Sequence, residues 1–243
     1  MKKRIFVLLL IFVLIMSSCT YVKKSSLSQE NQDNAVQNEK EESTIVPETP
    51  QDILPDMSAE EAREVNIFLS NFSEAYYVPE PECYSPEEAL IDFAFIHCKI
   101  NSYEKILYEE DYMGITATDV DAVLNRFFGK TVAHKTPKDN QQWIYRDGKF
   151  LTPAADGESY GTFSIATQVR LYDNGNYEVA FNVYNDREIG GGDIITDKTI
   201  YSLTADKASE KYTLTGHGAA VLKPKKYNGK DTYELVSYAV ENL

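Results

Sequence analysis

Histidine and cysteine, which supply most metal ligands and many catalytic groups, are scarce in this sequence of 243 residues. There are three of each, with a single tryptophan. The histidines His97, His134 and His217 are not at metal-ligand spacing, and neither an H-E-x-x-H nor a C-x-x-C motif occurs. The sequence therefore predicts no metal centre and no bound cofactor.

Basic residues are few relative to acidic ones. Lysine and arginine total 24 against 38 aspartates and glutamates, which gives a formal net charge of −14. A chain this acidic repels phosphate backbones, so we expect no nucleic-acid partner. The hydrophobic content of 43% is ordinary for a packed globular protein.

Long apolar runs are also missing. The longest, Ile5 to Met16, has 12 residues, whereas a membrane-spanning helix needs about 20. A basic start, Met1 to Arg4, precedes this run, and the small residues Ser17 and Ser18 follow it. This arrangement is typical of a secretory signal peptide rather than of a transmembrane anchor.

The four residues Met16-Ser17-Ser18-Cys19 resemble the lipobox of bacterial lipoproteins, with Met16 where leucine is usual. The resemblance implies that residues 1–18 are removed as a signal peptide. It further implies that Cys19 is diacylated, with chains such as palmitate, and anchors the protein to the extracytoplasmic face of the cell membrane. Loss of the three basic residues in the signal lowers the formal net charge to −17.

Residues 19–57 are predicted to be a lipidated N-terminus followed by a disordered tether. They are rich in Ser, Gln, Asn, Glu and Lys, and their few apolar residues show no period, so they cannot bury enough surface to offset their ordering entropy. A flexible coil of this length spans about 35 Å root-mean-square. Residues 58–243 are then a single domain.

Three helices are predicted at the start of that domain. Ser58 and Ser85 each precede a glutamate by three residues in a capping-box pattern, and Pro86 suits the first position of a helix. Thr118 is the expected cap of the third helix, and Gly129 its left-handed end. The expected ranges are 59–75, 86–101 and 118–128, with a further short helical turn over 103–109.

After these helices the hydrophobic period changes from 3.6 to 2. Apolar and polar residues alternate on both sides of the turn Asp173–Asn176, and Asn228-Gly229 is a hairpin-turn signal. Strands are expected in a hairpin over 143–151 and at 162–171, 177–183, 198–204, 211–222 and 231–240. The order predicts an α+β fold: about three N-terminal helices followed by a curved antiparallel sheet of five to six strands.

Cys83 and Cys98 remain once Cys19 is lipidated, and an oxidising compartment favours their pairing. Geometry argues against it. A helix from residue 86 places Cys98 about 18 Å along the axis from its start, whereas a disulfide needs Cα atoms within about 7 Å. Two separate thiols are predicted.

The segment Gly157–Gly161 matches the G-x-S-x-G pattern of serine hydrolases, with Asp193 or Asp197 and His217 following in a suitable chain order. That mechanism requires a buried strand before the serine and a helix after it. Here loop residues precede Ser159 and an alternating strand follows it. We therefore interpret this segment as a loop that leads into a strand, not as a catalytic elbow.

Other motifs are weaker. His97 and Cys98 are adjacent on a helix and point about 100° apart, so they do not form a thiol–imidazole pair. The stretch Asp119–Asp121 lacks the glycine and terminal glutamate of a calcium loop. The loop at Gly190–Gly192 is not followed by a phosphate-binding lysine, and Asp193 would repel phosphate.

Tyrosine is the one compositional excess, with 17 residues. Tyr172, Tyr184 and Tyr201 fall near sheet positions that we expect to be exposed. Exposed tyrosines can stack on sugars or anchor a protein partner. The alternative is that tyrosine simply favours strands.

The sequence favours a non-catalytic binding or interaction module at the cell surface, with a protein, peptide or glycan as its ligand. One alternative is a hydrolase of wall or extracellular material with a carboxylate site. Another is a solute receptor, although the two α/β lobes of such receptors are not indicated. A concave pocket that holds a carboxylate of shifted pKa would favour the enzyme. An aromatic surface without such a carboxylate would favour the binding module.

Overall fold

The computed structural model describes residues 50–243, except 84, 139–141, 156–159 and 190–192. The predicted signal peptide, Cys19 and most of the predicted tether therefore lie outside the described residues. No helix in the described part is both long enough and apolar enough to cross a membrane.

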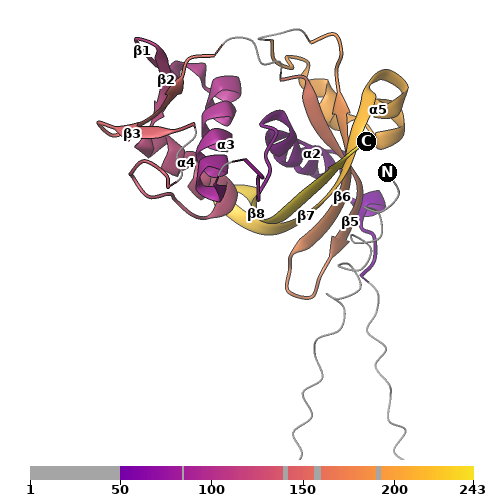
Figure 1. Cartoon of the computed structure of the whole chain (residues 1–243). Coiled ribbons are helices and arrows are strands. Elements are labelled where there is room, and N and C mark those ends of the chain that lie inside the picture. Colours follow the sequence, from indigo (N-terminus) through magenta and orange to yellow (C-terminus); the bar gives the residue numbers. More distant parts are fainter. Residues whose placement is uncertain (1–49, 84, 139–141, 156–159, 190–192) are drawn as a thin grey trace, which may run out of the picture. The chain divides into compact units, whose positions relative to one another are not determined.

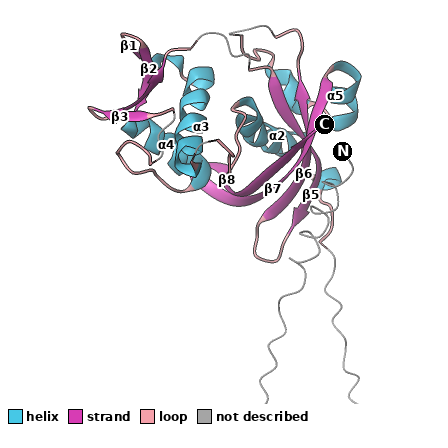
Figure 2. Cartoon of the chain, viewed as in Figure 1, coloured by secondary structure: helices cyan, strands magenta, loops and turns pink. Residues whose placement is uncertain are grey.

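The described residues form an α+β fold, as predicted, with four α-helices and two four-stranded antiparallel sheets (Figures 1 and 2). The prediction of a single sheet of five to six strands was wrong. The helices are α2 (Ala59–Glu74), α3 (Pro86–Asn101), α4 (Ala117–Phe128) and α5 (Ala205–Lys211), with 3-10 turns η1 (Leu54–Asp56), η2 (Tyr103–Lys105) and η3 (Lys198–Ser202). The strands are β1 (Leu107–Glu109), β2 (Tyr112–Thr116), β3 (Ile144–Arg146), β4 (Lys149–Pro153), β5 (Thr162–Leu171), β6 (Tyr177–Asn185), β7 (Thr213–Tyr227) and β8 (Lys230–Asn242).

The helix ends follow the capping signals, with one exception. Ser58 and Ser85 each form both hydrogen bonds of a capping box. The third helix starts two residues earlier than expected, because the hydroxyl of Thr116 rather than that of Thr118 accepts the N3 amide hydrogen bond. Gly129 ends that helix with φ +63°, as predicted.

The smaller sheet has the strand order β1-β2-β4-β3. Its hairpin β3–β4 was predicted, but β1 and β2 were not. Both strands lie before α4 in the chain. Strand β1 occupies residues that were expected to form a helical turn, and only η2 in that stretch is helical. Strand β2 pairs with β4 across the whole of α4, with Gly114 opposite Leu151. A pairing between segments so distant in sequence leaves no local signal.

The larger sheet is the meander β5-β6-β7-β8, whose last hairpin turns at Asn228-Gly229 as predicted. The strand expected over 198–204 was wrong. The Asp197 side chain accepts the Thr199 amide and starts η3 there, and the Thr204 side chain then caps α5. These local side-chain bonds to the backbone outweigh the strand preference of the intervening residues.

Helix α2 packs along the outer edge of β5. The Ser70 hydroxyl accepts a hydrogen bond from the Ser164 amide at 2.9 Å, and the Asn66 side chain accepts one from the Ala166 amide at 2.8 Å. Asp52 binds a further β5 amide in the same way. The backbone of this edge strand is therefore satisfied by side chains, which closes it to another strand.

Two hydrophobic clusters are formed, in part by alternate residues of the larger sheet. The larger cluster joins one face of the sheet to α2, α3 and α4, and the smaller one joins the other face to η3 and α5. The expectation that Tyr184 and Tyr201 are exposed was wrong, since both belong to the smaller cluster and are buried. Tyr172 is exposed, as expected.

Candidate functional site

A cavity of about 990 Å³ lies between the end of α2, the turn that follows it, the ends of α3 and α4, and strand β8. Its shape follows from local sequence. Helix α2 ends at Glu74, Tyr76 takes a left-handed conformation with φ +49°, and α3 begins at Pro86. The chain between the two helices thus forms one wall of the cavity, and β8 forms the opposite wall.

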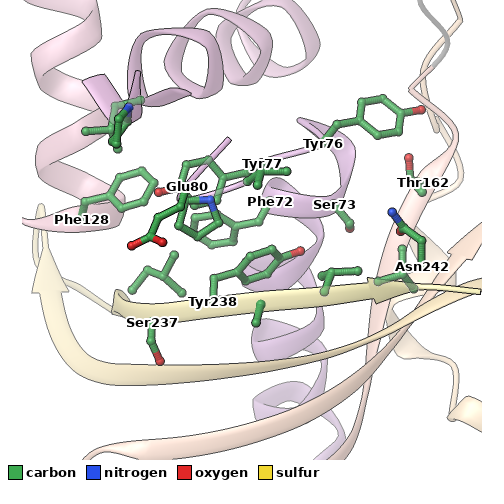
Figure 3. Close-up of a pocket in the computed structure, with 18 of the residues that line it drawn as sticks. Phe72, Ser73, Tyr76, Tyr77, Glu80, Phe128, Thr162, Ser237, Tyr238 and Asn242 are labelled. Atoms are coloured by element: carbon green, nitrogen blue, oxygen red, sulfur yellow. The ribbon is translucent and has the colours of Figure 1, made fainter. Parts of the chain in front are cut away.

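One end of the cavity is aromatic (Figure 3). The ring centroid of Tyr77 lies 5.3 Å from that of Phe128 and 5.8 Å from that of Phe72. Tyr238, from β8, completes the group with its ring 5.4 Å from Phe72 and 6.0 Å from Tyr77. Such rings offer large, rigid contact surfaces to an apolar ligand.

The hydroxyls of Tyr77 and Tyr238 are available to a ligand. Burial raises the pKa of Tyr77 to about 12 and also raises the pKa of Tyr238, so both phenols stay protonated. Within the described part of the chain, neither hydroxyl has a hydrogen-bond partner. Both can therefore donate to an acceptor placed in the cavity.

The other end of the cavity is polar, with Thr162 and Asn242 among its lining residues (Figure 3). Thr162 is 6% exposed, and its hydroxyl has no hydrogen-bond partner among the described residues. The hydroxyls of two neighbours in the lining are used: that of Thr215 donates to the Val183 carbonyl at 3.2 Å, and that of Ser73 donates to the Ser70 carbonyl at 3.2 Å. A buried unpaired hydroxyl is costly, and a ligand acceptor would satisfy it.

The cavity carries little net charge. Of the described residues that line it, Glu80 and Lys130 are charged, and they have opposite signs. This contrasts with the strongly acidic chain as a whole. The lining suits a ligand that is apolar, rich in hydrogen-bond acceptors and close to neutral.

A carboxylate with a strongly shifted pKa lies near the cavity but is not part of its lining. Burial raises the pKa of Glu74 to about 7, against the lowering effects of the Tyr201 hydroxyl and of Lys198. The Tyr201 hydroxyl donates to Glu74 Oε1 at 2.5 Å, and this pair ties α2 to η3. Glu74 is therefore positioned as a structural contact between two elements.

His97 and Cys98 are structural residues. Burial lowers the pKa of His97 to about 3, with smaller effects from Arg126 and Lys105. The His97 ring stacks on Phe93, with centroids 6.0 Å apart. Burial likewise raises the pKa of Cys98 to about 11, so its thiol is not a ready nucleophile.

The two remaining cysteines stay separate, as predicted. Cys98 is buried inside the fold, whereas Cys83 is exposed in the connection before α3.

The described members of the possible serine triad are not brought together. His217 Nδ1 lies 2.7 Å from the Asn182 side-chain oxygen, and the Asp197 side chain caps η3. The backbone carbonyl of Asp193 accepts the amide of Tyr160. Ser159 and the loop at Gly190–Gly192 lie outside the described residues.

The Asp119–Asp121 stretch lies in the first turn and a half of α4, not in a loop. Asp119 forms an ion pair with Lys105 at 2.9 Å, and Asp121 contacts His134 at 2.8 Å. Over the described ranges, no group of three or more His, Cys, Asp or Glu side chains could hold a metal ion.

The sequence reasoning did not find the cavity residues. Tyr77 lies between the first two predicted helices, and Tyr238 lies within the last predicted strand. One signal was present: the regular alternation of the last strand is interrupted between Leu235 and Tyr238, where a bulge lies. Bulges of this kind are frequent at sheet edges and next to functional sites.

No protein-family model matches the chain, and no curated protein or solved structure is similar to it at a significant level.

Proposed function

We propose that this protein is a non-catalytic binding module, anchored by lipid on Cys19 at the extracytoplasmic face of the cell membrane. Its ligand is a protein, peptide or glycan that enters the cavity beside β8. The observation that carries the proposal is a cavity with an aromatic end and three hydroxyls, those of Tyr77, Tyr238 and Thr162, for which the described residues provide no hydrogen-bond partner. Recognition sites combine apolar area with a few placed polar groups in this way.

The position of Glu74 supports binding over hydrolysis. An acid catalyst must reach its substrate, but the carboxyl of Glu74 is committed to Tyr201 and does not line the cavity. Apart from Glu80 and Lys130, the described lining offers neutral donors and aromatic rings, which suit binding.

The anchor is tested by the variant Cys19→Ala. The protein should leave the membrane fraction or remain unprocessed, and labelled palmitate should no longer be incorporated. Incorporation of the label into the variant at the wild-type level would show that Cys19 is not the acylated residue.

The binding site is tested by thermal unfolding of the full chain with wall fragments, glycans, peptides and metal salts. A ligand at 100 times its dissociation constant adds about 2.7 kcal/mol, which is a rise of about 5–10 °C in melting temperature for a domain of this size. The rise should be smaller in Thr162→Val, which removes the unpaired hydroxyl and keeps the side-chain volume. Equal rises in the wild type and this variant would place the site elsewhere, and no rise with any compound would contradict the proposal.

A further inference from the structure

The two edges of the larger sheet differ. At the β5 edge, side chains of α2 and of the preceding segment occupy backbone amides. At the opposite edge, β8 pairs with β7 alone, and within the described ranges no hydrogen bond joins its outer side to another element. An unpaired edge strand is a template for another strand.

The direction of the free backbone groups can be derived. The Leu243 amide donates to the Thr215 carbonyl at 2.9 Å, on the line of the β7–β8 ladder. In an antiparallel pair, successive residues point their amide and carbonyl alternately toward and away from the partner strand. Tyr238, Val240 and Asn242 therefore direct their backbone N–H and C=O outward.

The open part of the edge starts at Val236. Before it, Glu234 is packed against the end of α4, where it contacts Gly129 and accepts a hydrogen bond from Lys225. Val236 is the extra residue of the bulge, because Leu235 pairs with Leu222 and Ser237 with the preceding residue of β7. From this point the strand is largely exposed, and Val236 itself is 56% exposed.

The cavity reaches this edge from the face of the sheet, since Thr162 of β5 and Val183 of β6 line it as well. Every residue from Leu235 to Val240 lines it, although successive side chains point to opposite faces of a sheet. Six residues of strand span about 20 Å. When consecutive residues all line a cavity, their backbone is part of its wall. The ligand that matches such a wall has a peptide backbone of its own, whose N–H and C=O groups can pair with those of β8.

We propose that β8 accepts an extended, uncharged peptide segment of about six residues, which adds as a further strand along Val236–Asn242. The inference rests on the proposed function and names its ligand class. Strand addition obtains affinity from main-chain hydrogen bonds and specificity from pockets for alternate side chains. Here the aromatic end takes apolar side chains, the hydroxyl of Tyr238 can donate to the peptide, and the balanced charges of the lining favour a neutral segment.

The test uses a displayed library of random heptapeptides, selected on the full wild-type chain, with binding of the selected peptides measured by fluorescence anisotropy. The decisive variant is Val240→Pro, which removes one outward N–H and places a ring where the added strand would lie. Proline is tolerated at an edge position whose N–H faces outward, so the β7–β8 ladder is kept. Val240→Ala is the matched control, since it shortens the same side chain and keeps the N–H.

We expect binding at least tenfold weaker in Val240→Pro and much closer to wild type in Val240→Ala. If the proline variant does not fold, hydrogen exchange of the wild-type protein provides an independent test. In the free protein, the amides of Ala239 and Glu241 should exchange slowly and those of Val240 and Asn242 fast, and peptide binding should slow the second pair.

Equal binding by the proline variant, or amides of Val240 and Asn242 that stay fast in the complex, would overturn strand addition. If no peptide binds while a glycan raises the melting temperature through Thr162, the peptide inference is wrong and the cavity remains a binding site. If nothing binds, both proposals fail.

Discussion

Replacement of Glu74 by glutamine should change how the stability of the protein depends on pH. Burial raises the pKa of this carboxyl to about 7 in the folded protein, whereas its ordinary value is 4.5. Between these two values the folded chain holds a proton that the unfolded chain has released. The stabilising contribution of Glu74 is thus complete below about pH 4.5 and is lost as the pH rises through 7.

The magnitude follows from the size of the shift. A difference of one pKa unit corresponds to about 1.4 kcal/mol, so the shift of Glu74 is worth about 3 kcal/mol between pH 4 and pH 8. Glutamine cannot ionise, so Glu74→Gln should lack this fall in unfolding free energy. The amide also leaves a buried group less well paired near Tyr201, but that cost is the same at every pH.

The assay is urea unfolding of the wild type and Glu74→Gln at pH 4, 6 and 8. The difference in unfolding free energy between the two proteins should shift by about 3 kcal/mol in favour of the variant from pH 4 to pH 8. Tyr201→Phe is a second variant: it removes the hydroxyl that holds the Glu74 pKa down, so its stability should continue to fall at higher pH. A difference between wild type and Glu74→Gln that does not change with pH would refute the buried, protonated Glu74.

Three further predictions concern single sites. Thr162→Val should leave the unfolding free energy unchanged or raise it by about 1 kcal/mol, whereas Thr215→Val, which loses a made hydrogen bond, should lower it by about 1 kcal/mol; equal effects in urea unfolding would contradict the unpaired Thr162 hydroxyl. A histidine with a folded pKa of about 3 contributes stability above pH 6.5, so the wild type should lose about 5 kcal/mol of unfolding free energy as the pH falls from 6.5 to 3. His97→Gln should lack this loss. A variant that unfolds in acid like the wild type would refute this. Gly218→Ala should lower the melting temperature by several degrees, because a Cβ there would lie 2.2 Å from the Phe181 ring; an unchanged melting temperature would mean that the ring moves aside freely.

The elements of this fold follow largely from local sequence. A capping serine binds an amide three residues away, so the starts of α2 and α3 could be predicted. The alternation of β5 and β6 and the glycine turn before β8 are equally local. The start of α4 was missed by two residues because Thr116 and Thr118 are both capable caps, and the end of β2 selects the first of them.

Tertiary structure decided how these elements pair and what lies between them. Strand β2 reaches β4 across an intervening helix, and Tyr184 is covered by α5, a helix that the sequence pattern did not predict. The cavity depends on α2, α3, α4 and β8 meeting, so Thr162 and Tyr238, far apart in sequence, become its two ends. Capping and alternation are short-range interactions that a sequence displays, whereas burial and an unpaired hydroxyl arise only when distant segments are brought together.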